Sequence, residues 1–205
     1  MVGYHARTFI SSGHMNAQQC GPENQFAAMA TVQSGASMAL AGPGAPRTND
    51  KRDVMDLSMI IRPEHTFIGV SVATKWSGLQ NIAEKAASAF GIDERKILQA
   101  LESRESLGST GIGNGVAVPH AVVEGMTHPH GLLVRFARPL DFEAVDDVST
   151  DIAFALLFGE ANRGEYLNVL AAIARQLQTP GVLAAMRKAR TAEELYSDFL
   201  ADSRV

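Results

Sequence analysis

The chain has 205 residues, of which 46% are hydrophobic and 20% are charged, and its formal net charge at pH 7 is -4. This mildly acidic balance, with no cluster of basic residues, argues against nucleic acid and anionic membrane surfaces as partners. No apolar stretch reaches the roughly 18 residues that a membrane-spanning helix needs, so we expect no stable membrane insertion.

The first 54 residues differ in composition from the rest of the chain. They are rich in Gly, Ala, Ser, Gln, Asn and Pro, and residues 41–46 read AGPGAP, as in an unstructured connector. We therefore expect residues 1–54 to form a disordered N-terminal extension and residues 55–205 to form the folded domain. The single cysteine, Cys20, cannot make an internal disulfide, which favours a reducing, cytoplasmic location.

Regular patterning begins at residue 57. It predicts an apolar cluster over 57–61, a short strand over 65–70, and two helices that end near residues 90 and 106. Ser77 and Asp93 are the expected N-caps of these helices, and Gly91 is the expected stop of the first one.

Two further strands are predicted in the middle of the domain. One covers residues 131–137 and ends at Pro139. The other covers residues 151–158, where a nearly continuous apolar run indicates a strand that is covered on both faces.

Helical patterns return after residue 164. One helix ends before Pro180, a short one includes residues 182–186, and a last one opens with a capping box of Thr191 and Glu194. Helix-rich ends around a strand-rich middle predict an α/β fold, in which a small mixed sheet is sandwiched by helices.

The stretch from Gly108 to Ala121, GSTGIGNGVAVPHA, presents one imidazole after a flexible loop. Its glycines allow backbone conformations that are closed to other residues, so main-chain N–H groups can converge on a small anion. A short strand-like segment follows the glycines, and Pro119 restricts the direction in which His120 leaves it.

Several familiar sites do not fit this stretch. No Lys-Ser or Lys-Thr pair follows the glycines, and a strand rather than a helix comes next, so neither nucleotide-binding fingerprint applies. Ser109 with His120 as its base would make a hydrolase, but the GxSxG elbow is absent. His128 and His130 could join His120 around a metal, but no carboxylate cluster accompanies them. We expect neither a metal nor a cofactor.

His120 is better suited to carrying a phosphoryl group. Donors lie just upstream, among them Ser109 and Thr110, and Arg104 adds a positive charge somewhat earlier. Preorganised donors of this kind stabilise the charge of a phosphoryl group, while apolar surroundings keep water from the N–P bond. The attacking imidazole nitrogen must be neutral, so the other ring nitrogen needs a hydrogen-bond partner that fixes the tautomer.

Residues 104–120, RESLGSTGIGNGVAVPH, carry a resemblance to a known family. They resemble the phosphorylation-site signature of the fructose/mannitol-type IIA domains of the bacterial phosphotransferase system, above all those of the nitrogen-regulatory branch. Residues 139–146 and 151–157 are similar to the middle strands of that family. The likeness extends over roughly residues 57–200, and it implies the IIA fold.

The resemblance also implies a function. His120 would accept a phosphoryl group from a histidine phosphocarrier protein, as a tele-phosphohistidine, without turnover of a small molecule. The protein would then regulate targets related to nitrogen, carbon and potassium through protein–protein contact. Contact with the phosphate or with a partner would come from Arg104, Ser109, Thr110, Gly111, Gly113, Asn114 and Gly115.

The sequence departs from the family at one position. Many members have a second histidine at the start of the helix after the long apolar strand, and here Tyr166 stands in its place. Either Tyr166 or Asn168 would substitute as a hydrogen-bond partner. A sugar-transport IIA subunit, a binding module of the same fold without phosphoryl transfer, and a small hydrolase remain as alternative interpretations.

Overall fold

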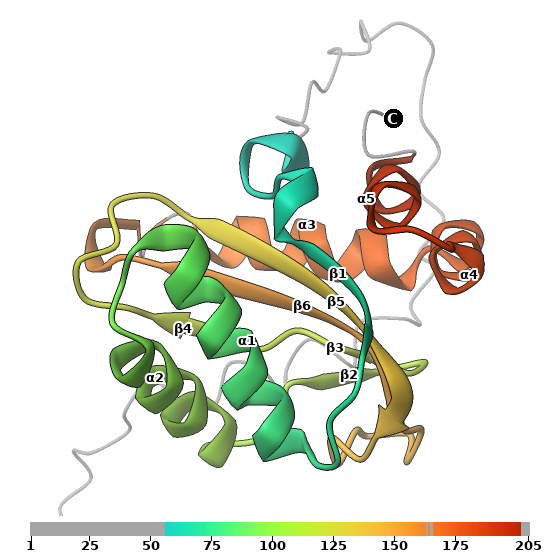
Figure 1. Ribbon diagram of the computed structural model, residues 1–205, viewed down its shortest axis with the longest axis horizontal. Coiled ribbons are helices and arrows are strands. Elements are labelled where there is room, and N and C mark those ends of the chain that lie inside the picture. Colours follow the sequence, from blue (N-terminus) through green and yellow to red (C-terminus); the bar gives the residue numbers. More distant parts are fainter. Residues whose placement is uncertain (1–55, 163, 165, 202–205) are drawn as a thin grey trace, which may run out of the picture. The chain divides into compact units, whose positions relative to one another are not determined.

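The computed structural model describes residues 56–162, 164 and 166–201. The predicted disordered extension over 1–54 lies outside these residues. The described chain forms one six-stranded sheet with helices on both faces (Figure 1). Its strands are β1 (Thr66–Val70), β2 (Gly111–Gly113), β3 (Val116–Ala117), β4 (His120–Val122), β5 (His130–Leu140) and β6 (Thr150–Phe158). Its helices are α1 (Lys75–Phe90), α2 (Glu94–Ser106), α3 (Tyr166–Gln178), α4 (Pro180–Lys188) and α5 (Ala192–Leu200), with short 3-10 turns at Leu57–Met59, Pro63–His65 and Glu160–Asn162.

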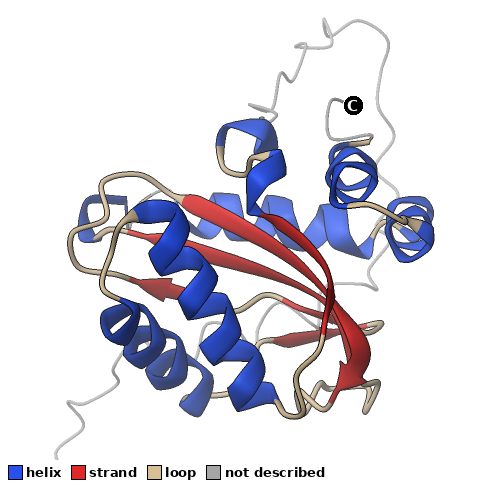
Figure 2. Cartoon of the chain, viewed as in Figure 1, coloured by secondary structure: helices blue, strands red, loops and turns tan. Residues whose placement is uncertain are grey.

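The sheet is mixed, as the sequence predicts. The strand order is β1-β5-β6-β3-β2, and β4 also pairs with β6. Strands β5 and β6 are antiparallel, as are β2 and β3, whereas β1 is parallel to β5 and both β3 and β4 are parallel to β6. The α/β fold class is therefore confirmed, with α1 and α2 on one face of the sheet and α3 to α5 towards the other (Figure 2).

Strand β6 is the centre of the core. Its side chains alternate between two apolar clusters, because successive residues of a strand point to opposite faces. Ile152, Phe154 and Leu156 face the cluster formed with α3, α4 and α5. Ala153 and Ala155 face the cluster formed with α1 and α2. The prediction of a strand covered on both faces is confirmed. Because β6 is held between the two clusters, it gives β4 a fixed strand to pair with.

The first helix begins earlier than predicted. Thr74, not Ser77, is the N-cap, and its hydroxyl accepts a hydrogen bond from the Ser77 amide at 3.2 Å. The Ser77 hydroxyl in turn accepts from the Thr74 amide at 3.0 Å, so Ser77 completes a capping box from the third helical position. The other two predictions are confirmed: Gly91 ends the helix with a φ of 68°, and Asp93 caps α2.

Two more boundaries differ from the sequence prediction. Strand β5 runs through Pro139 to Leu140, because the β5–β6 pairing is irregular between Arg135 and Leu140, where a residue without an N–H costs no ladder bond. The first strand begins at Thr66, since His65 belongs to the preceding 3-10 turn.

At the last helix the predicted capping box is formed only in part. Thr191 accepts a hydrogen bond from the Glu194 amide at 3.2 Å, as expected of an N-cap. The Glu194 carboxylate accepts from the Arg190 amide at 2.6 Å rather than from the N-cap amide. Within the described residues no helix is long and apolar enough to cross a membrane.

Gly131 offers a test of the packing between β5 and the ring of Phe154. A Cβ at Gly131 would lie 2.5 Å from Cζ of Phe154, a fully buried ring. We expect Gly131→Ala to lower the free energy of unfolding by about 1–3 kcal/mol through overpacking. Gly181→Ala in α4 is the matched control, because nothing lies within 4 Å of its added methyl group. Urea unfolding measures both, and equal stabilities would contradict the prediction.

Candidate functional site

The glycine-rich stretch folds into a β-hairpin. Strands β2 and β3 are antiparallel, and Asn114 and Gly115 form the turn with φ angles of 53° and 76°. Asn-Gly is the preferred pair for a two-residue hairpin turn in which both residues have positive φ. The chain then passes through Val118 and Pro119 and enters β4 at His120. His120 is thus the first residue of a new strand, held beside Leu156 of β6.

Two groups hold the His120 ring in a defined state. Its Nδ1 lies 2.8 Å from the carbonyl oxygen of Val118, and its Nε2 lies 2.9 Å from Nε of Arg104, near the end of α2. A carbonyl can only accept a hydrogen bond and a guanidinium can only donate one. Nδ1 therefore carries the hydrogen, and Nε2 carries the lone pair.

The His120 side chain is neutral at physiological pH. The residue is only 7% exposed, and burial lowers the pKa of its imidazole from 6.5 to about 4. The hydrogen bond to the Val118 carbonyl opposes this shift, whereas the positive charge of Arg104 adds to it. The ring therefore offers an unprotonated Nε2, which is the form needed for nucleophilic attack.

The start of the predicted anion loop is fixed to α2. The carboxylate of Glu105 accepts hydrogen bonds from the amide of Thr110 at 3.1 Å and from its hydroxyl at 2.6 Å. The Ser109 hydroxyl accepts from the Gly111 amide at 3.0 Å and donates to the carbonyl of Phe142. These donors serve the fold of the loop, and their contact with phosphate stays a prediction.

The hairpin turn is fixed from both sides. The Asn114 amide donates to Asp146 at 2.7 Å, and the Asn114 carbonyl accepts from Nη2 of Arg187 at 2.6 Å. Gly113 and Gly115 have positive φ, and an added Cβ would lie 3.0 Å from Asp146 at Gly113 and 2.5 Å from Arg187 at Gly115. These two glycines are explained by the turn and its close neighbours, so a phosphate contact for them also stays a prediction.

A buried ion pair beneath the site was missed from the sequence. Lys75 at the start of α1 is 6% exposed, and its ammonium lies 3.4 Å from the carboxylate of Glu105 and 3.2 Å from that of Glu143. Glu105 directly follows Arg104 and also holds Thr110, so the pair ties the arginine and the loop to α1. The sequence could have pointed to this ion pair only through Glu105, a carboxylate within the motif. Its partner Lys75 lies 30 positions earlier in the chain, so local spacing does not link the two.

Tyr166 and Asn168 lie in the first turn of α3. The Tyr166 ring stacks on Phe158 with centroids 4.6 Å apart. Phe158 pairs with Val122, two residues beyond His120 in β4, so Tyr166 lies against the same end of the sheet. Asn168 is exposed. The role of either residue as a substitute for the second histidine stays a prediction.

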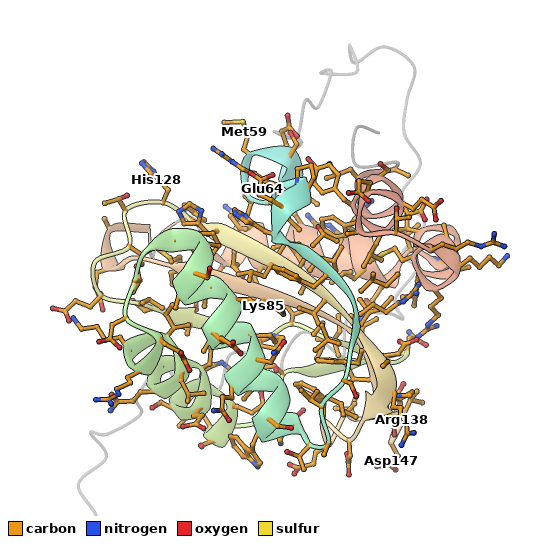
Figure 3. The ribbon with its side chains drawn as sticks, in the orientation of Figure 1. Met59, Glu64, Lys85, His128, Arg138 and Asp147 are labelled. Carbon is orange, nitrogen blue, oxygen red and sulfur yellow. The ribbon has the colours of Figure 1, made fainter. Side chains whose placement is uncertain are left out.

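The three histidines considered for a metal lie on different elements: His120 in β4, His128 in a loop and His130 in β5. His130 stacks on Phe90 with centroids 4.4 Å apart, across β6 from His120, and the exposed His128 projects from the loop before β5 (Figure 3). In the part of the chain that the structure describes, no group of three or more His, Cys, Asp or Glu side chains is placed to hold a metal ion.

Comparison with known proteins decides the family. Residues 59–202 match the model of the phosphoenolpyruvate-dependent sugar phosphotransferase system, EIIA 2. The chain belongs to this family. The resemblance read from residues 104–120 is thereby confirmed.

The relatives of this chain include nitrogen regulatory proteins and a sugar-specific component. A nitrogen regulatory protein from Bradyrhizobium diazoefficiens is 36% identical over 143 residues, covering 70% of this chain and 94% of the relative. The crystal structure of nitrogen regulatory protein IIA-Ntr from Neisseria meningitidis matches with a TM-score of 0.66 and 26% identity, covering 70% of this chain and 98% of that one. A fructose-specific EIIA component from Haloferax volcanii is 30% identical over 151 residues, covering 73% and 97%.

The state of the His120 ring can be measured directly. We expect the His120 imidazole to titrate near pH 4 by NMR, because its burial favours the neutral form. In the unfolded chain the His120 imidazole has a pKa near 6.5, so over this range the unfolded state takes up the proton first. The contribution of His120 to stability therefore falls as the pH drops from about 6.5 to about 4. Arg104→Met should raise the midpoint by removing a repelling charge. Lys96→Met, on the same helix, is the control for the midpoint of His120. A wild-type midpoint above 6 would contradict the assignment of a buried, neutral imidazole.

The buried ion pair predicts unequal costs for two similar substitutions. Glu105→Gln should lower the free energy of unfolding by about 3 kcal/mol, because it leaves the buried Lys75 charge with one partner fewer. Glu143→Gln should cost less than about 1 kcal/mol, since that carboxylate is 72% exposed. Chemical denaturation of the two variants gives the comparison, and equal losses would speak against a central role for Glu105.

Proposed function

We propose that this EIIA 2 protein accepts a phosphoryl group on Nε2 of His120 from a histidine phosphocarrier protein. It then acts on regulatory targets, related to nitrogen, carbon and potassium, by protein–protein contact. The observation that carries the proposal is the pairing of His120, whose neutral ring has its lone pair on Nε2 and its hydrogen committed to Val118. The similarity to nitrogen regulatory proteins supports the regulatory part.

The transfer step exchanges one N–P bond for another. The Nε2 lone pair of His120 attacks the phosphorus of the phosphohistidine on the donor. The donor N–P bond breaks, and its electron pair returns to the donor imidazole. The His120 ring keeps its Nδ1 hydrogen and becomes positively charged, and the carbonyl of Val118 stabilises that charge through the bond that it already makes at 2.8 Å.

Arg104 has two roles in this step. In the unphosphorylated protein its Nε donates to Nε2, and this bond must be given up when the lone pair attacks. The guanidinium also donates through Nη1 to the Gly108 carbonyl at 3.0 Å, which keeps it at the site. Once released from Nε2, the freed N–H group can donate to an oxygen of the arriving phosphoryl group.

Exposed apolar side chains beside the site suit a protein partner. Leu107 follows α2 and is 74% exposed, while its amide donates to the Arg104 carbonyl at 3.2 Å. Leu167 follows Tyr166 and is 47% exposed. Apolar side chains that stay in water in the free protein gain free energy when a partner covers them. They support contact with a phosphocarrier protein and with a regulatory target.

Sugar transport is a second candidate. The fructose-specific relative, at 30% identity, supports it. In this case the phosphoryl group would pass from His120 to a IIB component of a sugar permease. Transfer of label from the phosphorylated protein to an isolated fructose-type IIB protein would favour this function, and retention of the label would favour regulation.

A phosphorylation assay tests the proposal. The protein is incubated with phosphoenolpyruvate, the general phosphotransferase enzyme and the histidine phosphocarrier, and acid-labile phosphate is followed. We expect label on the wild-type protein and none on His120→Gln. Arg104→Gln should slow labelling by about ten-fold or more, since it removes one charged donor.

His128→Gln is the control, because His128 is exposed and lies in the loop before β5. It should be labelled as fast as the wild type. A wild-type protein that takes no label would support a binding module of the same fold instead. Label that persists on His120→Gln would move the acceptor to another residue, and either result would overturn the proposal.

A further inference from the structure

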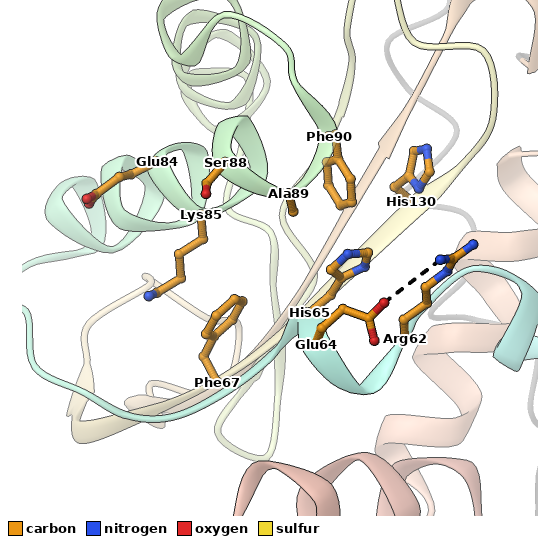
Figure 4. A pocket seen from close by; sticks show the side chains of 10 residues that line it. All are labelled: Arg62, Glu64, His65, Phe67, Glu84, Lys85, Ser88, Ala89, Phe90 and His130. Atoms are coloured by element: carbon orange, nitrogen blue, oxygen red, sulfur yellow. Dashed lines mark ion pairs between the residues drawn. The ribbon is translucent and has the colours of Figure 1, made fainter.

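A hollow lies on the opposite side of β6 from His120. It is bounded by the second half of α1, the residues that lead into β1, and the first residue of β5 (Figure 4). Its volume is about 730 Å³, within the range of about 300–1000 Å³ that is usual for small-molecule sites. Strand β1 is at the edge of the sheet, so the hollow opens at the margin of the domain.

Aromatic and imidazole rings form much of its lining. Phe90 contacts two histidines: His65 edge-on, with centroids 4.8 Å apart, and His130 by stacking. Burial lowers the pKa of both imidazoles, so both are neutral at pH 7 and each combines one N–H donor with one acceptor. His65 is 8% exposed, and its buried Nδ1 has no hydrogen-bond partner among the described residues. Flat rings suit a flat ligand, and the partly buried, neutral imidazole of His130 offers it a polar edge.

One cation in the hollow is held over a ring. The Lys85 ammonium lies 4.2 Å from the centroid of Phe67, and no carboxylate of a described residue lies within ion-pair distance of it. At the other end Arg62 pairs with Glu64 at 3.8 Å. An ammonium without a carboxylate partner in a half-enclosed space attracts an anion.

The total charge limits which anion fits. Arg62 and Lys85 contribute two positive charges, Glu64 and Glu84 contribute two negative ones, and the imidazoles are neutral, so the lining has no net charge. A triphosphate or a nucleic acid would be repelled by the two carboxylates. A single negative charge placed at Lys85 is compatible with them.

We propose that this hollow binds a small aromatic or heteroaromatic carboxylate. The carboxylate lies at the Lys85 ammonium, and the flat ring packs against Phe67 and Phe90, within reach of the imidazole of His130. The site is separate from the phosphoryl acceptor, because β6 lies between β5, which carries His130, and β4, which begins at His120. The proposal goes beyond phosphoryl transfer and does not depend on it.

The test uses the full chain and nicotinate as the probe, with the imidazole proton signals followed by NMR at pH 7. We expect saturable shifts of the His65 and His130 signals, while the His120 signal stays in place. Nicotinamide, which keeps the ring without the charge, should bind about ten-fold more weakly. Acetate, which keeps the charge without the ring, should not shift the two signals. Failure of nicotinate to shift them at about 10 mM would overturn the proposal.

Two variants test the charge at the site. Lys85→Met keeps an unbranched side chain over Phe67 and should weaken nicotinate binding about ten-fold. Glu84→Gln removes an exposed carboxylate from the lining and should strengthen binding a few-fold. Lys96→Met, which removes an exposed lysine from α2, is the control and should leave binding unchanged. Thermal unfolding establishes that each variant is folded, and unchanged binding in both Lys85→Met and Glu84→Gln would overturn the proposal.

Discussion

The chemistry of this protein depends on one constraint: the imidazole of His120 is buried between a carbonyl that only accepts and a guanidinium that only donates. The Val118 oxygen fixes the hydrogen on Nδ1, and Arg104 points an N–H group at Nε2. Burial in this position makes the charged ring unfavourable and holds its pKa near 4. An exposed histidine with the same sequence neighbours would exchange between tautomers and be partly protonated near pH 6.5.

The rest of the domain fixes the positions of His120 and Arg104 relative to each other. His120 enters the sheet by pairing with Leu156 of β6, a strand that both apolar clusters enclose. Arg104 belongs to the last turn of α2, and the next residue, Glu105, is fixed by the buried Lys75 and by Thr110. The arginine and the histidine therefore come from two elements that are tied to α1 and to β6, respectively. This rigidity suits a site whose geometry must be ready before a partner arrives.

The glycine-rich loop has a structural role in addition to the phosphate contact that its composition predicts. Flexible residues with many donors favour an anion cradle when the sequence is read alone. In the fold, the amides of Thr110, Gly111 and Asn114 bind Glu105, Ser109 and Asp146. The glycines serve a tight hairpin and its close neighbours. The hairpin brings His120 to the start of β4, where it pairs with β6, and contact of the glycines with phosphate stays a prediction.

The sequence alone determined the features that depend on neighbouring residues: the apolar run of β6, the caps at Asp93 and Thr191, the stop at Gly91, and the motif that ends in Pro119 and His120. Local spacing carries these signals, because capping and strand patterning act within a few residues. Only the tertiary structure decided which groups meet His120, that Lys75 pairs with Glu105, and that two histidines share Phe90 in a separate hollow. Those contacts join residues far apart in the chain, and their burial and charge exist only after the sheet and helices have packed.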